Sequence, residues 1–399
     1  MKKLLFVDDE PKVLQGLQRQ LHAMRNEWNM NFVGGGQQAL DFMAGNPVDV
    51  VISDMIMPGM DGSQLLTEVA KRHSGTVRIV LSGHADREAV LRLVGPAHQY
   101  LAKPCNAEEL RTAIARAVAL RDLLGNEHLK QLATRIKCLP SLPALHHQLT
   151  AEFQKDDPSM ERIGEIISRD VGMTAKILQL VNSSFFGLPQ PINKTFDAVM
   201  YLGLTTVRSL VMSLQVFSQF DPKLLHNFSL DALAQHCWMT GVVAGRVAQT
   251  EQKEMKMRDQ CFLAGLLHDT GQLILATGLP EEYASVLNTA KTQNLPVAQA
   301  EKEHFGATHA DVGAYLLGLW GLPDPIIEAV AMHHCPSLCV VPGFSPVIAV
   351  HVADAFVHEQ SGISTELPVP VIDMAHLTRL GLADRIETWR NVGLGGEEF

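Results

Sequence analysis

The stretch VDVVISDMIMPGMDG, residues 48–62, decides the fold of the first part of this chain. Its apolar half is typical of a strand buried on both faces, as in parallel sheets, and Asp54 follows before a turn containing Pro58 and Gly59. Similar apolar runs occur in LLFVDDE (4–10), RIVLSG (78–83) and YLAKP (100–104), and helical stretches such as PKVLQGLQRQLHAM (11–24) separate them. This alternation predicts a doubly wound α/β unit with a parallel sheet.

Polar residues end each of these predicted strands. Asp8 and Asp9, Asp54, Ser82 and Lys103 would therefore meet in one crevice, because parallel strands bring their carboxyl ends to the same edge of the sheet. The carboxylate oxygens of the three aspartates are suitable ligands for a hard divalent cation. With the cation present, Asp54 could attack a phosphoryl donor while Lys103 and Ser82 hold the transferred oxygens. The aspartates could instead cap helices, but a cap requires neither the lysine nor the serine.

In order and spacing, residues 1–124 resemble the receiver domain of bacterial response regulators. The resemblance implies a five-stranded, flavodoxin-like sheet, a Mg²⁺ ion and a phosphoryl group accepted by Asp54. It also implies a sensor histidine kinase or phosphotransfer protein as partner, and autophosphorylation from a donor. The implied roles are magnesium binding by Asp8, Asp9, Asp54 and the Ile56 carbonyl, phosphoryl contact by Ser82 and Lys103, and a rotamer switch at Tyr100.

The bulk composition indicates a cytoplasmic protein of two or three domains. Its 399 residues are 46% hydrophobic, yet no stretch approaches the ~20 apolar residues of a membrane span. The six cysteines are scattered singly, which favours buried free thiols over disulfides. A net charge of −10 without a Lys/Arg cluster argues against direct DNA binding.

The pattern changes after residue 104, where strands give way to helical periodicity. Residues 105–138 fit either a last receiver helix that continues as a connector or a helix, a turn and a second helix. Gly125-Asn126 is a helix-stop signal and favours the second interpretation. We expect a receiver domain at 1–124, a helical connector at 125–138, an all-α domain at 139–360 and a C-terminal helical extension at 361–399.

Histidines and aspartates, which are common metal ligands, recur in the predicted helices of the all-α domain. Imidazole and carboxylate ligands suit iron, manganese or zinc. For any one histidine alone, a buried, hydrogen-bonded side chain would be the better interpretation, but the joint order is harder to explain that way. His304 and His351 fall outside this order, as helix-surface or supporting residues. The ordered set is His236, His268, Asp269, His309, His333, His334 and Asp354.

This order resembles the HD superfamily of metal-dependent phosphohydrolases. Within that superfamily, LPSLPAL (139–145), SRDVGMTAKILQLVNSSFFG (168–187) and FDAVMYLGLTTVRSL (196–210) resemble the HDOD output domain. The resemblance implies an all-helical domain that is often joined to receivers and whose members mostly act in signalling without demonstrated catalysis.

By resemblance to hydrolytic members, a dinuclear iron, manganese or zinc centre would have Asp269 as its bridging ligand. His236, His268 and Asp354 would complete the first metal site, and His309, His333 and His334 the second. Gln272 occupies the position at which the cyclic di-GMP phosphodiesterase branch has a lysine near the substrate phosphate, and no Gly-Tyr-Pro follows His334. Both departures weaken the case for that substrate.

Two hypotheses follow. In the first, phosphorylation of Asp54 controls a helical domain that binds a downstream protein or nucleotide. In the second, the helical domain is a receiver-gated phosphodiesterase acting on a cyclic dinucleotide or another phosphoester. A homodimer could form through a receiver helix face or through the connector, and the sequence does not choose between them.

Overall fold

The structure is a computed structural model in which two compact units are distinguished, and each is described by itself. The first comprises Met1–Lys137, Gln179–Pro191 and Gly318–Gly321, and the second comprises Cys138–Leu178, Ile192–Leu317 and Leu322–Phe399. The residues described are 1–83, 96–136, 139–183, 186, 188, 190–213, 228–251, 254–360, 368 and 370–395.

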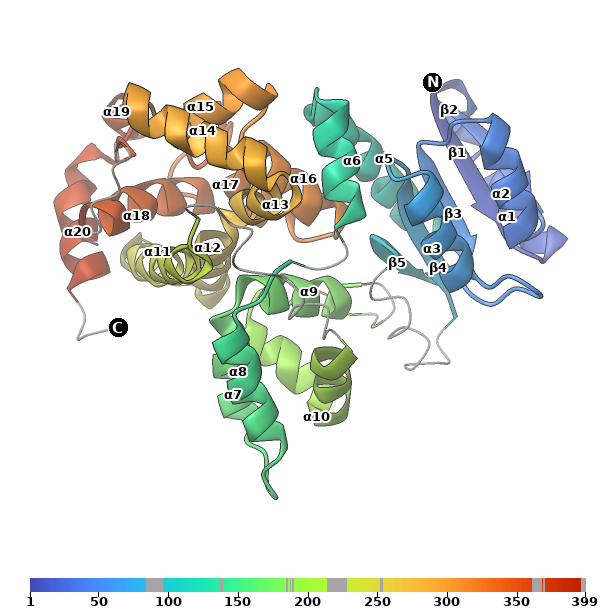
Figure 1. The fold of residues 1–399 in the computed structure, drawn as a ribbon, viewed down its shortest axis with the longest axis horizontal. Helices are drawn as coiled ribbons and strands as arrows, with labels where there is room; N and C mark the ends of the chain where they lie inside the picture. The colour runs from blue at the N-terminus through green and yellow to red at the C-terminus, as the bar shows by residue number, and fades with distance from the viewer. Residues whose placement is uncertain are drawn as a thin grey trace. The chain divides into compact units, whose positions relative to one another are not determined.

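The first unit is built on a parallel five-stranded sheet in the order β2-β1-β3-β4-β5 (Figure 1). This confirms the predicted doubly wound fold. Because β1 and β3 are paired at the centre, in a register that includes Val7 with Ser53, the residues that follow both strands emerge at one edge. The strands are β1 Lys2–Val7, β2 Trp28–Val33, β3 Val50–Asp54, β4 Val77–Ser82 and β5 Gln99–Ala102.

Helices flank this sheet, and the start of one of them is fixed by Gly62. A Cβ atom at Gly62 would lie 2.2 Å from the Asp54 carbonyl oxygen, so only glycine lets the chain return this close to the end of β3. Asp61 and Gln64 form a capping box there. The helices are α1 Pro11–Gln20, α2 Gly36–Gly45, α3 Gly62–Arg72, α5 Ala107–Leu123 and α6 Glu127–Arg135, with a 3₁₀ turn η1 at His22–Asn26.

The segment after the sheet consists of two helices separated by a turn. Asn126 caps α6 by accepting from the backbone amides of His128 and Leu129. The fully buried Arg78 of β4 connects α6 to the sheet, because its guanidinium donates to the carbonyl oxygens of Pro96 at 2.6 Å and Thr134 at 2.8 Å. Residues 127–135 therefore pack on the receiver fold as part of the first unit.

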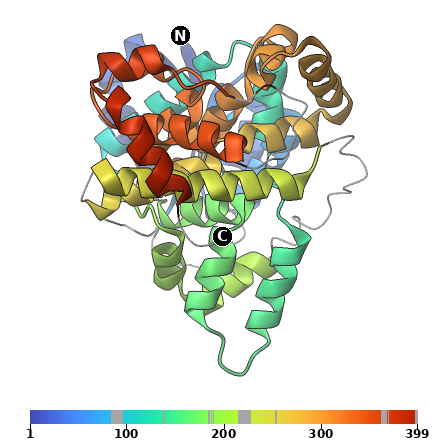
Figure 2. The same cartoon turned by 90° about the vertical axis from the view of Figure 1, so that its left-hand side faces the viewer.

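The second unit is helical, and the described residues contain no strand after β5. The long helix α11 packs against α12 and α18, and Figure 2 shows α20 lying across α11. The elements that lie mainly in this unit are α7 Pro143–Phe153, α8 Met160–Ser168, α9 Val171–Val181, α10 Thr195–Ser213, α11 Leu230–Glu251, α12 Met255–Leu267, α13 Thr270–Gly278, α14 Pro280–Gln293, α15 Val297–Phe305, α16 His309–Leu319, α17 Asp324–Met332, η5 Pro336–Leu338, α18 Pro346–Gln360, α19 Met374–Arg379, η6 Ala383–Arg385 and α20 Ile386–Leu394.

Two sequence expectations concern membrane-spanning segments and the cysteine thiols. Among the described residues, no helix combines the length and the apolar character that crossing a membrane requires. The described cysteines are free, and Cys237 and Cys261 are buried as expected. Cys335 is exposed in the loop after α17, and Cys105 and Cys339 are half-buried.

Candidate functional site

The first candidate site lies at the carboxyl edge of the sheet, where the structure brings Asp8, Asp9, Asp54 and Lys103 together. Carboxylate oxygens of the three aspartates lie within 4.8 Å of one another. The Lys103 Nζ is 2.7 Å from Asp8 Oδ2 and 2.5 Å from Asp54 Oδ1. Three carboxylates exceed the charge of one ammonium, so the cluster fits a divalent cation bound through oxygens.

Burial and charge set the protonation of this cluster. Burial, with the neighbouring Asp8 charge, raises the pKa of Asp54 above its ordinary value, although Lys103 acts in the opposite direction. Burial also lowers the pKa of Lys103, but its hydrogen bonds to Asp54 and Asp8 outweigh that effect and the net pKa is raised. Lys103 therefore remains a cation, and Asp54 is a more basic carboxylate than an exposed one.

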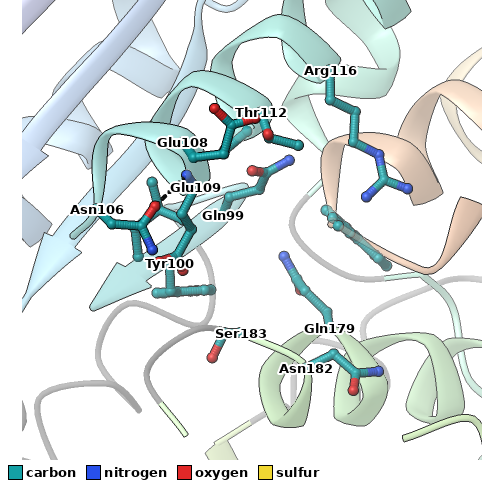
Figure 3. A pocket seen from close by; sticks show the side chains of 14 residues that line it. Gln99, Tyr100, Asn106, Glu108, Glu109, Thr112, Arg116, Gln179, Asn182 and Ser183 are labelled. Atoms are coloured by element: carbon teal, nitrogen blue, oxygen red, sulfur yellow. Dashed lines mark hydrogen bonds between the residues drawn. The ribbon is translucent and has the colours of Figure 1, made fainter. Parts of the chain in front are cut away.

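The other predicted receiver residues have different surroundings. Ile56 lies in the turn after β3 with a side chain that is 74% exposed. Ser82 ends β4, but its side chain, like residues 84–95, lies outside the described part of the chain. Burial raises the pKa of the Tyr100 hydroxyl. Figure 3 shows Tyr100 beside a cavity of about 500 Å³ within the first unit, which Arg116 and Gln179 also line.

The second candidate site is in the helical unit and begins with a first cluster of His236, His268 and Asp354. They come from α11, the end of α12 and α18, respectively. The His236 and His268 Nε2 atoms are 3.2 Å apart, and His236 Nε2 is 3.1 Å from Asp354 Oδ1. His268 and Asp354 are buried, and His236 is partly exposed.

A second cluster comprises His309, His333 and His334, which come from the start of α16 and the residues after α17. The Nε2 atoms of His334 and His309 are 2.9 Å apart. The His333 Nε2 is buried and has no hydrogen-bond partner among the described residues.

Asp269 stands between the two clusters with one oxygen toward each. Its Oδ2 is 3.3 Å from His268 Nε2 and 3.8 Å from His236 Nε2. Its Oδ1 is 3.1 Å from His309 Nε2 and 3.9 Å from His333 Nε2. The structure thus groups the seven predicted residues into two sets that share one carboxylate.

Local packing holds this arrangement together. Asp269 precedes α13, and a Cβ atom at Gly271 would lie 1.9 Å from the His309 carbonyl oxygen. The start of α13 therefore touches the start of α16 directly, which no larger residue at 271 would allow. This contact brings Asp269 to His309.

Hydrogen bonds to the Nδ1 atoms orient the histidine rings of the site. Carbonyl oxygens only accept hydrogen bonds, so His268 Nδ1 donates to Gly265 at 2.7 Å and His333 Nδ1 donates to Val330 at 2.8 Å. His309 Nδ1 lies 2.7 Å from Glu301 Oε2. When these rings are neutral, each Nε2 carries a lone pair directed into the site, as metal binding requires.

Two histidines of the second cluster have opposite pKa shifts. Burial lowers the pKa of His309, but the carboxylates of Glu301 and Asp269 outweigh it and hold the net pKa well above the ordinary value. Burial and the neighbouring His309 lower the pKa of His334 to about 3. His334 is therefore neutral at physiological pH, whereas His309 is protonated in the metal-free site until a metal displaces its proton. Imidazole and carboxylate donors of this kind fit iron, manganese or zinc.

Two buried or half-buried residues near the site were not predicted from the sequence. Glu301 of α15 is fully buried and accepts hydrogen bonds from the His309 backbone amide and from Tyr283 Oη. No sequence signal distinguishes it from the other glutamates of α15. His358 Nε2 lies 3.4 Å from Asp354 Oδ1, and its spacing of four residues on one helix could have indicated it.

The residues outside the predicted ligand order also have definite places. His351 Nδ1 donates to the His333 carbonyl oxygen at 2.7 Å, so it supports the second cluster. His304 is exposed on α15. Gln272 is half-buried, and its backbone amide donates to the Asp269 carbonyl oxygen.

Comparisons with known proteins identify both parts. Residues 4–115 match the response regulator receiver domain family, and residues 139–336 match the HDOD domain family. This chain is a response regulator with an HDOD domain. It belongs to two-component signalling, in which a receiver domain is phosphorylated from a histidine kinase.

Several relatives are similar to parts of this response regulator. It is 34% identical to the hydrogenase transcriptional regulatory protein HoxA of Cupriavidus necator over 33% of this chain and 27% of HoxA. It is 27% identical to an uncharacterized protein of Treponema pallidum over 57% of this chain and 44% of that protein. The chain thus spans less than half the length of both relatives. Among solved structures, the MmoQ response regulator of Methylococcus capsulatus is 24% identical with a TM-score of 0.49, covering 63% of this chain and 97% of MmoQ.

Proposed function

We propose that Asp54 accepts a phosphoryl group and thereby controls the HDOD domain, which acts by binding a downstream protein or nucleotide. The observation that supports this most directly is the Lys103 ammonium, which bonds to Asp54 and Asp8 together at the carboxyl edge of the sheet. A helix cap would not require such a bridge.

The chain's own residues would contribute in three ways. Asp8 and Asp9 with Asp54 would hold Mg²⁺, which when bound offsets the repulsion between the carboxylates and the donor phosphate. An Asp54 oxygen would attack the donor phosphorus, so that an acyl phosphate forms as the bond to the donor's leaving group breaks. Lys103 would then attract the new phosphoryl oxygens in place of the Asp54 carboxylate, which favours one of two receiver states.

The test compares four samples: unphosphorylated wild type, wild type treated with a small phosphodonor and Mg²⁺, and donor-treated Asp54→Asn and Asp41→Asn proteins. Asp41 is exposed on α2 and bonds only to Gln37 in the described contacts, so it is the matched control. We expect an adduct by mass spectrometry, with altered hydrogen exchange or oligomeric state, in wild type and Asp41→Asn alone. Identical behaviour of phosphorylated wild type and Asp54→Asn would refute the proposal.

A second candidate function is favoured by one observation, the division of the two Asp269 oxygens between the clusters. In this function the HDOD domain is a metal-dependent phosphohydrolase gated by the receiver, and it acts on a cyclic dinucleotide or another phosphoester. A pair of bound metals would supply Lewis acidity toward the phosphoester. His236, His268 and Asp354 would hold one metal, His309, His333 and His334 the other, and Asp269 both.

Elemental analysis beside a phosphoester hydrolysis screen, each with and without phosphodonor, tests this second function. We expect about two metals per chain and hydrolysis of at least one substrate. Asp269→Asn should reduce both, whereas Glu303→Gln, an exposed change on α15 outside the clusters, should reduce neither. Metal-free wild type, or metal-loaded wild type that hydrolyses nothing, would exclude the hydrolase.

A further inference from the structure

The surroundings of Asp354 do not match those of an ordinary buried ion pair. Three imidazole nitrogens surround its Oδ1 atom: His236 Nε2 at 3.1 Å, His358 Nε2 at 3.4 Å and His268 Nε2 at 3.8 Å. Asp354 is only 2% exposed, yet this oxygen reaches hydrogen-bond geometry with no described residue. Burying a carboxylate oxygen without a hydrogen bond costs free energy of folding. This indicates that a further group binds between the Asp354 oxygen and the three imidazole nitrogens.

His358 is the member of this group that lies nearest to solvent. It is four residues after Asp354 on α18, so both side chains are on one face of that helix. Its ring centroid is 4.4 Å from that of His236, and its side chain is 27% exposed. Three imidazoles of α11, α12 and α18 therefore surround one carboxylate oxygen, and His358 covers it on the outer side.

A hydrogen-bonding role alone explains this arrangement poorly. One carboxylate oxygen can accept from imidazole N–H groups, but His268 Nε2 is the nitrogen without hydrogen when its ring is neutral, because Nδ1 donates to Gly265. A cation at the centre would accept lone pairs from all the rings and from the carboxylate at once. Zinc and iron favour such a mixture of imidazole and carboxylate ligands.

We propose that His358 is a further ligand of the first metal, beside His236, His268 and Asp354. This inference rests on the metal site of the second candidate function. His358 would be the fourth ligand of this metal besides the shared Asp269, and it would occupy a coordination position that a water molecule would otherwise take. Closed ligand sets of this kind are typical of structural metal sites rather than catalytic ones. His358 would thus make the first metal mainly structural and leave the second, held by His309, His333 and His334, as the more open one.

The experiment measures zinc binding and cobalt spectra of the full chain as wild type, His358→Gln, His358→Asp and His304→Gln. His304 is an exposed histidine of α15 that serves as the control. Zinc release to a chromogenic chelator gives the affinity of each metal, and visible absorption of the Co²⁺ form reports its ligands. Far-UV circular dichroism of the same samples shows that the helical unit is folded.

In His358→Gln we expect one of two metals to bind at least about 10-fold more weakly, with an altered cobalt spectrum, while the other is unchanged. His358→Asp should recover most of the affinity because a carboxylate can replace the imidazole as ligand. The proposal is overturned if His358→Gln matches His304→Gln in both affinity and cobalt spectrum. A wild type that binds neither metal overturns this proposal together with the metal site, and leaves the role of Asp54 untouched.

Discussion

At the scale of single residues, both candidate sites contain carboxylates that are paired with a basic side chain, a lysine in the receiver and a histidine in the helical unit. Lys103 bonds to Asp8 and Asp54 at once, and Glu301 bonds to His309 from behind the second cluster. In both places a charged partner sets the protonation of the neighbouring group.

The raised pKa of Asp54 predicts how stability depends on pH. Burial and Asp8 favour its protonated form in the folded state, so the carboxylate costs stability as pH rises from its ordinary value of 3.8 through the folded pKa. In metal-free protein, Asp54→Asn should therefore raise the free energy of unfolding more at pH 7 than at pH 4. Urea unfolding at both pH values checks this, with Asp41→Asn as control. A gain that does not change with pH would contradict it.

Glu301 is predicted to be a positioning residue for His309. Glu301→Gln weakens the acceptor of the Nδ1 hydrogen bond, so metal affinity should fall about 10- to 100-fold and stability by about 1–3 kcal/mol. In the metal-free protein the pKa of His309 should fall, because the Glu301 charge that raises it is lost. Chelator competition and imidazole NMR titration measure these effects. Glu303→Gln, an exposed change on the same helix, should leave all of them unchanged.

At the scale of secondary-structure elements, both sites depend on where elements end and how closely they approach. The receiver cluster is at the ends of β1, β3 and β5, which the sheet order brings together. The HDOD clusters lie near the end of α12, the starts of α13 and α16 and the end of α17, with α11 and α18 contributing from their interiors. Glycines at the closest approaches allow these positions.

Gly271→Ala should separate the starts of α13 and α16. Its Cβ would lie 1.9 Å from the His309 carbonyl oxygen, so the backbone must move, at a cost of about 1–3 kcal/mol or more, and Asp269 would move away from His309. Thermal unfolding and metal content should both fall. Gly245→Ala in α11 is the control, since its Cβ would be 3.5 Å from Phe262, an ordinary contact. Equal metal content in both variants would show that this close approach does not hold the site.

At the scale of the whole molecule, each unit contains one candidate site, so ligands of the two sites should stabilise different parts of the chain. Asp54 and its neighbours lie in the first unit, and the histidine clusters lie in the second. A ligand that binds only the folded state stabilises the unit that holds it.

Scanning calorimetry should therefore separate the two contributions. A metal at 100 times its Kd adds about 2.7 kcal/mol, so treatment with a chelator should lower the Tm of one transition by several degrees. Restoring Zn²⁺ should recover that transition, whereas Mg²⁺ with a phosphoryl analogue should raise the other. If Zn²⁺ shifts neither transition, the helical unit holds no stabilising metal.

The sequence by itself determined the parallel sheet, the change to helices after residue 104 and the positions of the polar residues in both sites. These features can be predicted from local sequence, because the residues that indicate a buried strand, a helix end or a strand end lie within a few positions of one another. The break between α5 and α6 was signalled in the same way by Gly125 and Asn126.

Only the tertiary structure decided which side chains meet across helices. The division of the Asp269 oxygens, the buried Glu301 behind His309 and the anchoring of α6 by Arg78 have no reliable local signature. They depend on the rotation of each helix about its axis and on approaches of a few ångströms between segments far apart in the chain. Packing of the whole unit fixes these quantities, and no short stretch of sequence contains them.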